Sequence, residues 1–177
     1  MSMLKITRLG DPVLRKPAEP VNPEDIASPD IQRLIDDMTE TMRDSEGVGL
    51  AAPQVNVPKR VILIEVRGGN PRYPDRDEVP LTALINPEIA PIGNEVEGGW
   101  EGCLSIPDLR GVVPRYKRIA VSALDRNGRP VKFEAGDFFA RVIQHEVDHL
   151  DGIVFLDRMK NFATLTHLRE FTRFWQQ

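Results

Sequence analysis

The sequence contains one cysteine, Cys103, and three histidines among 177 residues. A single cysteine excludes an intrachain disulfide, and the absence of an export signal then favours a reducing cytoplasm. No run of about 18 apolar residues occurs, which argues against a membrane-spanning helix. Residues 1–6 lack the apolar core of a signal peptide and the Arg- and Ser-rich character of a transit peptide. We therefore expect a cytoplasmic protein without a membrane partner.

The chain also lacks a strong excess of either charge. Its 23 Lys and Arg residues against 27 Asp and Glu residues give a net charge of −4, so bulk attraction predicts no direct nucleic-acid binding. The length suits one domain with a sizeable core. Fifteen prolines exceed the average share of roughly 5% and predict many loops and short elements rather than a helical bundle.

Proline positions and apolar periodicity predict the first elements. Four prolines between Thr7 and Pro23 indicate an extended arm. Ser28 followed by Pro29 is a helix start, and apolar residues at 31, 34, 35, 38 and 42 predict an amphipathic helix that ends at Gly47. The remaining predicted elements are a strand at 61–66, a surface loop at 67–80, a strand at 81–85 ended by Asn86-Pro87, a hairpin with strands 119–124 and 131–134, and a last helix over 161–177.

The segment 47–54, GVGLAAPQ, superficially fits the dinucleotide-binding pattern G-x-G-x-x-A. That pattern must follow a strand and open a helix, whereas this segment follows a helix and runs into Pro53 and Pro58. A loop or edge strand whose small residues admit close approach to the backbone is the better interpretation. A plain glycine-rich turn is the alternative.

His145 to His149 form an H-E-x-x-H pattern within an apolar segment, 138–150, that Gly136-Asp137 caps and Gly152 closes. On a helix the two imidazoles project from one face and can bind one divalent metal, while Glu146 can reach a water on that metal. The helix is apolar nearly all round and is predicted to be buried. Burying the three polar side chains unpaired is costly, and a metal satisfies them together. A hydrogen-bonded cluster without metal is the competing interpretation.

A catalytic metal site needs three protein ligands and an open position. The extended protease pattern H-E-x-x-H-x-x-G-x-x-H is absent, but Cys103 lies upstream in a turn between glycine-rich and proline-bounded segments. A thiolate with two imidazoles suits Zn(II) or Fe(II). The residues alone leave three further classes open: a zinc endopeptidase, a cysteine hydrolase with Cys103 as nucleophile, and a non-catalytic metal-binding fold.

Three segments together resemble the signature motifs of peptide deformylase: GVGLAAPQ at 47–54, EGCLS at 101–105 and QHEVDHL at 144–150. Their order and spacing match the family across essentially the whole chain, and DPVLR at 11–15 resembles its N-terminal segment. The resemblance implies a single compact α+β domain over residues 1–177, with antiparallel β-sheets packed around the central H-E-x-x-H helix. An N-terminal helix and a C-terminal helix complete this expected fold.

The resemblance also implies an activity and a site. The enzyme would remove the N-formyl group from the N-terminal formyl-methionine of newly synthesised polypeptides and release formate. Cys103, His145 and His149 would bind the metal, and Glu146 would act as general acid and base. The amide of Gln54 and the backbone N–H of Leu104 would hold the formyl oxygen.

The substrate residues are predicted in the same way. Val48 and Gly49 would lie on an edge that pairs with an extended peptide. The methionine side chain would contact Val48, Phe138 and Val142, although the last two serve equally well as core residues. Arg110 would contact the substrate backbone, unless it forms a surface ion pair.

Two polar residues of the H-E-x-x-H helix have no role in this assignment. Asp148 is expected to be a local hydrogen-bond or salt-bridge partner rather than a ligand. Arg141, beside the expected pocket, has no explanation in the sequence.

The resemblance suggests Fe(II) as the cofactor, with Zn, Ni or Co able to substitute. The expected partner is an N-formyl-methionyl peptide or nascent chain, with the ribosome as a further one. The GWEGC form at 99–103 resembles a subgroup that includes organellar members. Without a transit peptide, a bacterial cytoplasm is favoured.

Overall fold

A computed structural model describes residues 2–70 and 77–176 of the chain. Four α-helices and eight β-strands occur in this part. The helices are α1 (Pro29–Asp44), α2 (Asp137–Leu150), α3 (Phe155–Arg158) and α4 (Leu168–Phe174). The strands are β1 (Gly49–Ala51), β2 (Val61–Val66), β3 (Val79–Pro91), β4 (Val96–Cys103), β5 (Ile106–Tyr116), β6 (Arg118–Leu124), β7 (Pro130–Gly136) and β8 (Thr166–His167).

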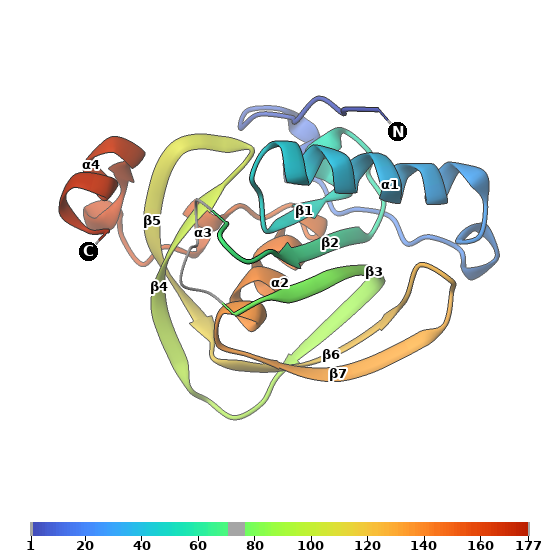
Figure 1. Ribbon diagram of the computed structural model, residues 1–177. Coiled ribbons are helices and arrows are strands. Elements are labelled where there is room, and N and C mark those ends of the chain that lie inside the picture. The colour runs from blue at the N-terminus through green and yellow to red at the C-terminus, as the bar shows by residue number, and fades with distance from the viewer. Residues whose placement is uncertain (1, 71–76, 177) are drawn as a thin grey trace.

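The strands form two antiparallel sheets, one in the order β1-β2-β3-β6-β7 and the other in the order β4-β5-β8. Helix α2 lies at the centre and contacts strands of both sheets, while α1 crosses the far side of β1 and β2 (Figure 1). This arrangement confirms the predicted α+β fold with antiparallel sheets around the H-E-x-x-H helix.

Strand β2 separates two apolar clusters, because both of its faces are buried. Ile62 and Ile64 pack in a cluster with Val147 of α2. Val61 and Leu63 point the other way and pack in a cluster with Met38 of α1. The alternation of side chains along a strand therefore converts one continuous apolar run into two hydrophobic layers.

The two long helices begin as their local sequence predicts. The Ser28 hydroxyl accepts a hydrogen bond from the N–H of Ile31, and Pro29 occupies the first turn of α1. Gly136 is the N-cap of α2, and Gly152 adopts a left-handed conformation (φ +75°) just after the end of that helix. Segment 47–54 was predicted to be a loop or an edge strand, and its residues 49–51 form the edge strand β1, which pairs with β2 at the border of the five-stranded sheet.

The predicted strand 81–85 was wrong at its end, since β3 continues through Asn86-Pro87 to Pro91. The ladder shifts register between Ile85 and Glu88, so the proline sits in a bulge where no donor is required. Asn86 adopts a left-handed conformation, and its amide pairs with the N–H and carbonyl of Val21 at 2.9 and 2.8 Å. The predicted loop at 67–80 was wrong for its last residues, which lie in β3, and 71–76 lie outside the described residues.

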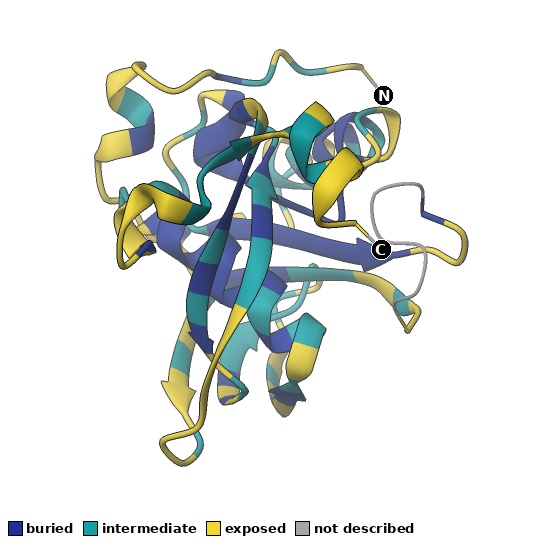
Figure 2. Ribbon diagram, turned by 90° about the vertical axis from the view of Figure 1, so that its left-hand side faces the viewer, coloured by how far each residue is buried: buried dark blue, intermediate teal, exposed yellow. Residues whose placement is uncertain are grey.

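The last helix is shorter than predicted. Helix α4 begins at Leu168, because the segment before it forms a 3₁₀ turn (Phe162–Thr164) and then pairs as β8 with β5. No described residue of α4 is buried, and Figure 2 shows this helix mainly in the exposed and intermediate colours. None of the helices in residues 2–70 and 77–176 has the length and apolar character needed to cross a membrane.

Candidate metal centre

Two neighbouring elements bring three soft and borderline ligands together. Helix α2 presents His145 and His149 with their ring centroids 5.1 Å apart, as an i, i+4 pair must. Strand β4 ends at Cys103, just after a register shift between Glu101 and Cys103 in its pairing with β5. The Cys103 Sγ lies 3.2 Å from the His149 Nε2. The three ligand atoms all lie within 4.8 Å of one another and are buried.

The donor set fits one metal ion. Ligand bonds of about 2.0–2.3 Å at tetrahedral angles place sulfur and nitrogen ligands roughly 3.5 Å apart, which is compatible with this cluster. Beside it, the Glu146 Oε2 is buried and has no hydrogen-bond partner among the described residues. An unpartnered carboxylate oxygen next to two imidazoles and a thiol is what a site for a metal and its bound water requires.

Charge in the cluster points the same way. Burial raises the pKa of Cys103, but the nearby His149 and His145 outweigh it and bring the pKa well below its ordinary value. Burial lowers the pKa of His145, but hydrogen bonds to Cys103 and Glu101 raise it well above its ordinary value. The cluster thus favours a thiolate with one positive charge beside it, and a metal cation can take the place of the imidazole proton.

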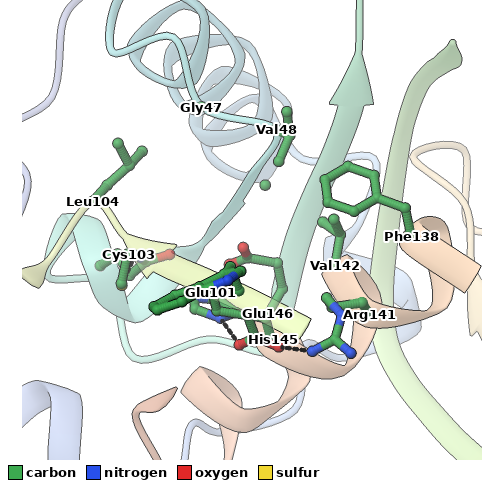
Figure 3. A pocket seen from close by; sticks show the side chains of 14 residues that line it. Gly47, Val48, Glu101, Cys103, Leu104, Phe138, Arg141, Val142, His145 and Glu146 are labelled. Carbon is green, nitrogen blue, oxygen red and sulfur yellow. Dashed lines mark hydrogen bonds and ion pairs between the residues drawn. The ribbon is translucent and has the colours of Figure 1, made fainter. Parts of the chain in front are cut away.

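Glu101 orients the first histidine and was missed by the sequence analysis. Its Oε2 lies 2.9 Å from the His145 Nδ1, which leaves Nε2 for the metal (Figure 3). Arg115 donates to both Glu101 oxygens at 2.9 and 3.0 Å. Burial raises the pKa of Glu101, but the hydrogen bonds and charges of His145 and Arg115 together outweigh it and hold the pKa well below its ordinary value, so this carboxyl is ionised. Side chains two residues apart in a strand point to the same face. A predicted strand through 101–103 would therefore have indicated that Glu101 lies on the same side as Cys103.

Asp148 of α2 pairs with two arginines and does not belong to the candidate metal-ligand group. It accepts a hydrogen bond from Arg115 at 2.5 Å and another from Arg158 at 2.7 Å. The prediction that Asp148 is a local salt-bridge partner is confirmed. Arg115 consequently links Asp148 of helix α2 to Glu101 of β4, the strand that also carries Cys103.

The structure also explains Arg141. Its guanidinium donates to Glu101 at 2.9 Å and to the backbone carbonyls of Val113 and Glu97 at 2.8 and 2.7 Å. A Cβ on Gly99 would lie 2.7 Å from the Arg141 Cζ, so this glycine makes room for the guanidinium. Arg141 thereby fastens β4 and β5 to the helix that carries the histidines.

Glu146 points into the site beneath β1. A Cβ on Gly49 would lie 2.3 Å from its Oε1, so only glycine at 49 admits the carboxylate. Burial is the largest influence on Glu146 and raises its pKa to about 7, with the charge of Cys103 acting in the same direction. A carboxyl with this pKa can both accept and return a proton near neutral pH.

Gln54 is held in one orientation by three contacts. Its Oε1 accepts the N–H of Ala51 at 2.8 Å, so its NH₂ group faces the cluster. There the Nε2 lies 3.2 Å from the Ser105 Oγ and 3.4 Å from the Cys103 Sγ. Ser105 is a second residue that the sequence analysis did not single out. Its hydroxyl locates the Gln54 amide next to the candidate metal ligands.

A pocket opens beside the cluster. Its lining includes Val48, Gly49, Gln54, Leu104, Phe138, Val142, Glu146, Cys103 and His145 (Figure 3). All the residues predicted to contact substrate therefore reach this pocket, with the exception of Arg110. Arg110 lies behind Gly102, where a Cβ would come within 2.0 Å of its Nη1.

Comparisons with known proteins agree with this geometry. Residues 3–164 match the family described as Polypeptide deformylase. The chain is 48% identical to Peptide deformylase 1 of Prochlorococcus marinus over 164 residues, 93% of this chain and 84% of that one. It is 49% identical to Peptide deformylase 2 of Pseudomonas putida over 89% of this chain and 88% of that one. A crystal structure of a Met-Ala-Ser-bound class I type b peptide deformylase from Acinetobacter baumannii superposes with a TM-score of 0.86 at 43% identity, covering 90% of this chain and 100% of that one.

Proposed function

This chain belongs to the polypeptide deformylase family, and from that premise we propose how its residues divide the work of the reaction. The protein is a hydrolase that removes the N-formyl group from an N-terminal formyl-methionine. Family membership decides against the endopeptidase, the cysteine hydrolase and the non-catalytic metal-binding fold. The observation that carries the proposed roles is the buried group of Cys103, His145 and His149 beside a Glu146 oxygen that has no hydrogen-bond partner in the described part of the chain.

Cys103, His145 and His149 would hold one divalent ion, and the family resemblance favours Fe(II), with Zn, Ni or Co as substitutes. When bound, such an ion supplies Lewis acidity and lowers the pKa of its water towards about 7. Glu101 keeps the His145 ring in the orientation that presents Nε2. The lowered pKa of Cys103 keeps its sulfur in the thiolate form that binds a metal.

Glu146 is the proposed general base and acid. Its carboxylate would accept a proton from the attacking water and then deliver that proton to the amine nitrogen that leaves as formate is released. A pKa near 7 suits both transfers, because the same group must gain and lose the proton in each turnover. Gly49 contributes by leaving the space that the carboxylate occupies.

Gln54 and Leu104 are the proposed donors to the formyl oxygen. Because the N–H of Ala51 donates a hydrogen bond to the Gln54 Oε1, the Gln54 side chain presents its NH₂ group to the site. The backbone N–H of Leu104 follows directly after the ligand Cys103. Two donors aimed at the developing oxyanion stabilise the transition state more than the substrate, each by roughly 3–4 kcal/mol.

The substrate would lie along β1 as an added strand, with Val48 and Gly49 at that edge. Val48, Phe138 and Val142 would surround the methionine side chain, since all three line the pocket. Arg110 would contact the peptide only at the place where the peptide passes Gly102. We take residues 1–177 as one catalytic domain acting on nascent chains at the ribosome in a bacterial cytoplasm, in keeping with bacterial relatives.

The test is formate release from a formyl-Met tripeptide by protein purified without oxygen, with metal content measured in parallel. Glu146→Gln should retain the metal and lose at least about 10²-fold in kcat. Glu134→Gln, a surface change on β7, is the matched control. Unaltered kcat in metal-loaded Glu146→Gln would overturn the role given to Glu146. Internal cleavage of the unformylated peptide would overturn the reaction itself.

A further inference from the structure

The N-terminal arm crosses the two segments that carry Gln54 and Leu104. The N–H of Thr7 donates to the carbonyl of Gln54 at 2.8 Å, and the N–H of Leu9 donates to the carbonyl of Ser105 at 2.9 Å. Between them, the Arg8 Nη1 donates to the carbonyl of Leu104 at 2.8 Å, across 96 residues of sequence. Three successive residues of the arm thus bond to both segments in turn.

These bonds restrain the backbone on either side of the proposed oxyanion donors. The carbonyls of Leu104 and Ser105 belong to the two peptide planes that follow the Leu104 N–H. With both carbonyls bonded, rotation about the Leu104 backbone is limited. The bond from Thr7 restrains the short 3₁₀ turn Ala52–Val55, from which the Gln54 side chain extends.

The arm does not need Arg8 in order to stay attached to the protein. Farther along, Leu14, Ala18 and Val21 are buried with relative exposures of 0%, 7% and 3%. The N–H of Ala18 also donates to the carbonyl of Leu150 at 2.7 Å. Arg8 itself is exposed and lies outside the apolar clusters. Its bond to Leu104 therefore has little to do with burying apolar surface.

We propose that Thr7–Leu9 form a clamp that sets the spacing between the Gln54 amide and the Leu104 N–H, with Arg8 as its positioning residue. The inference rests on the proposed role of those two groups as oxyanion donors. A donor is effective only within about 2.7–3.1 Å of the position that the oxyanion will occupy. A misplacement of about 1 Å can cost 10²-fold in rate, so a clamp that acts through the donors affects catalysis without touching the substrate.

The experiment compares Arg8→Ala, Arg8→Lys and Lys5→Ala in the full-length, metal-loaded enzyme. Lys5 is the matched control, an exposed cation of the same arm. Formate release from formyl-Met-Ala-Ser yields kcat and KM, and binding of Met-Ala-Ser, which lacks the formyl oxygen, measures affinity without the donors. Arg8→Ala should lower kcat roughly tenfold, a part of the 10²-fold loss for a full misplacement. KM, Met-Ala-Ser binding and the pH profile should match the parent, and Arg8→Lys should recover part of kcat.

Gln54→Ala, assayed in parallel, separates failure of the clamp from failure of the proposed function. If Gln54→Ala keeps the parent kcat, the donor role itself is wrong, and the clamp falls with it. If Gln54→Ala loses kcat while Arg8→Ala does not, only the clamp is overturned. The clamp is also overturned if Arg8→Ala fails to fold or changes KM alone, because the arm is anchored independently of Arg8.

Discussion

Replacing Glu101 by glutamine tests whether this one buried carboxylate of β4 holds helix α2, which carries His145 and His149, in place. Glu101 is 4% exposed and accepts hydrogen bonds from Arg115, Arg141 and His145, all between 2.9 and 3.0 Å. Glutamine has the same size but no charge, and it turns one acceptor oxygen into an NH₂ donor facing other donors. The arginines then lose a buried counter-charge, and His145 loses its orienting partner.

The expected loss is large on two scales. Removing one partner of a buried ion pair costs about 3–5 kcal/mol of unfolding free energy, because the other charge stays buried. Domains have about 5–15 kcal/mol of stability in total, so the variant should still fold but should unfold at a lower urea concentration than the parent. Removing the hydrogen-bond partner of His145, a candidate metal ligand, should also weaken metal affinity roughly 10–100-fold.

The pH dependence of this loss follows from the lowered pKa of Glu101. In the folded protein the Glu101 carboxylate stays ionised at pH values below its ordinary pKa of 4.5. Burial opposes this, but the hydrogen bonds from His145 and Arg115 and their charges outweigh it. Its contribution is therefore fully present above pH 4.5 and declines as the pH falls below that value. The gap in stability between the parent and Glu101→Gln should be widest at neutral pH and should narrow in acid.

Urea unfolding of the metal-free proteins between pH 7 and pH 2.5 measures the difference in stability across the range where the Glu101 contribution declines, and chelator competition at pH 7 measures metal affinity. Glu134→Gln is the control, because its ion pair with Arg118 is exposed (63% and 58%) and should contribute less than about 1 kcal/mol. An unfolding free energy of Glu101→Gln within about 1 kcal/mol of the parent at pH 7, together with equal metal affinity, would refute this role of Glu101.

Three further changes have definite expectations. Gly49→Ala should lower kcat at least roughly tenfold, because the new methyl would lie 2.3 Å from the Glu146 Oε1; parent-like formate release would contradict this. Cys103→Ala should abolish stoichiometric metal binding as measured by elemental analysis, and one retained ion per chain would show that the thiolate is not a ligand. Phe155→Ala should cost about 3–5 kcal/mol in urea unfolding, since Phe155 is 1% exposed and packs beside His145. The matched change Phe162→Ala, at a residue 65% exposed, should stay within about 0.5 kcal/mol of the parent, and equal losses in both would refute the cavity argument.

Local patterns in the sequence determined the two long helices and part of the site. Ser28-Pro29 and a 3.6-residue apolar period suffice for α1, since capping and amphipathicity act within a few residues. The spacing of His145, Glu146 and His149 needs only helix geometry to place both imidazoles on one face. Cys103 was a candidate ligand from its residue type and position, and the family motifs added Gln54 and Leu104, but the mutual distances of these residues are not contained in any local pattern.

Strand ends and the C-terminal segment show where local patterns fail. Asn86-Pro87 is a stop signal in isolation, yet pairing of Asn86 with Val21 allows β3 to continue through a bulge. Thr166 and His167 lie in a stretch with helical spacing, yet they pair with β5 instead. Hydrogen bonds to partners far along the chain outweigh local preferences that are worth only a few tenths of a kcal/mol per residue.

Tertiary structure alone decided how the site is assembled. Cys103 reaches His149 across 46 residues, Glu101 reaches His145 across 44, and Arg8 reaches Leu104 across 96. Which strand lies beside which, and where its register shifts, depends on the packing of the whole domain and has no period in the sequence. The sequence by itself supplied the candidate groups for the chemistry, whereas the fold determines which partners orient them.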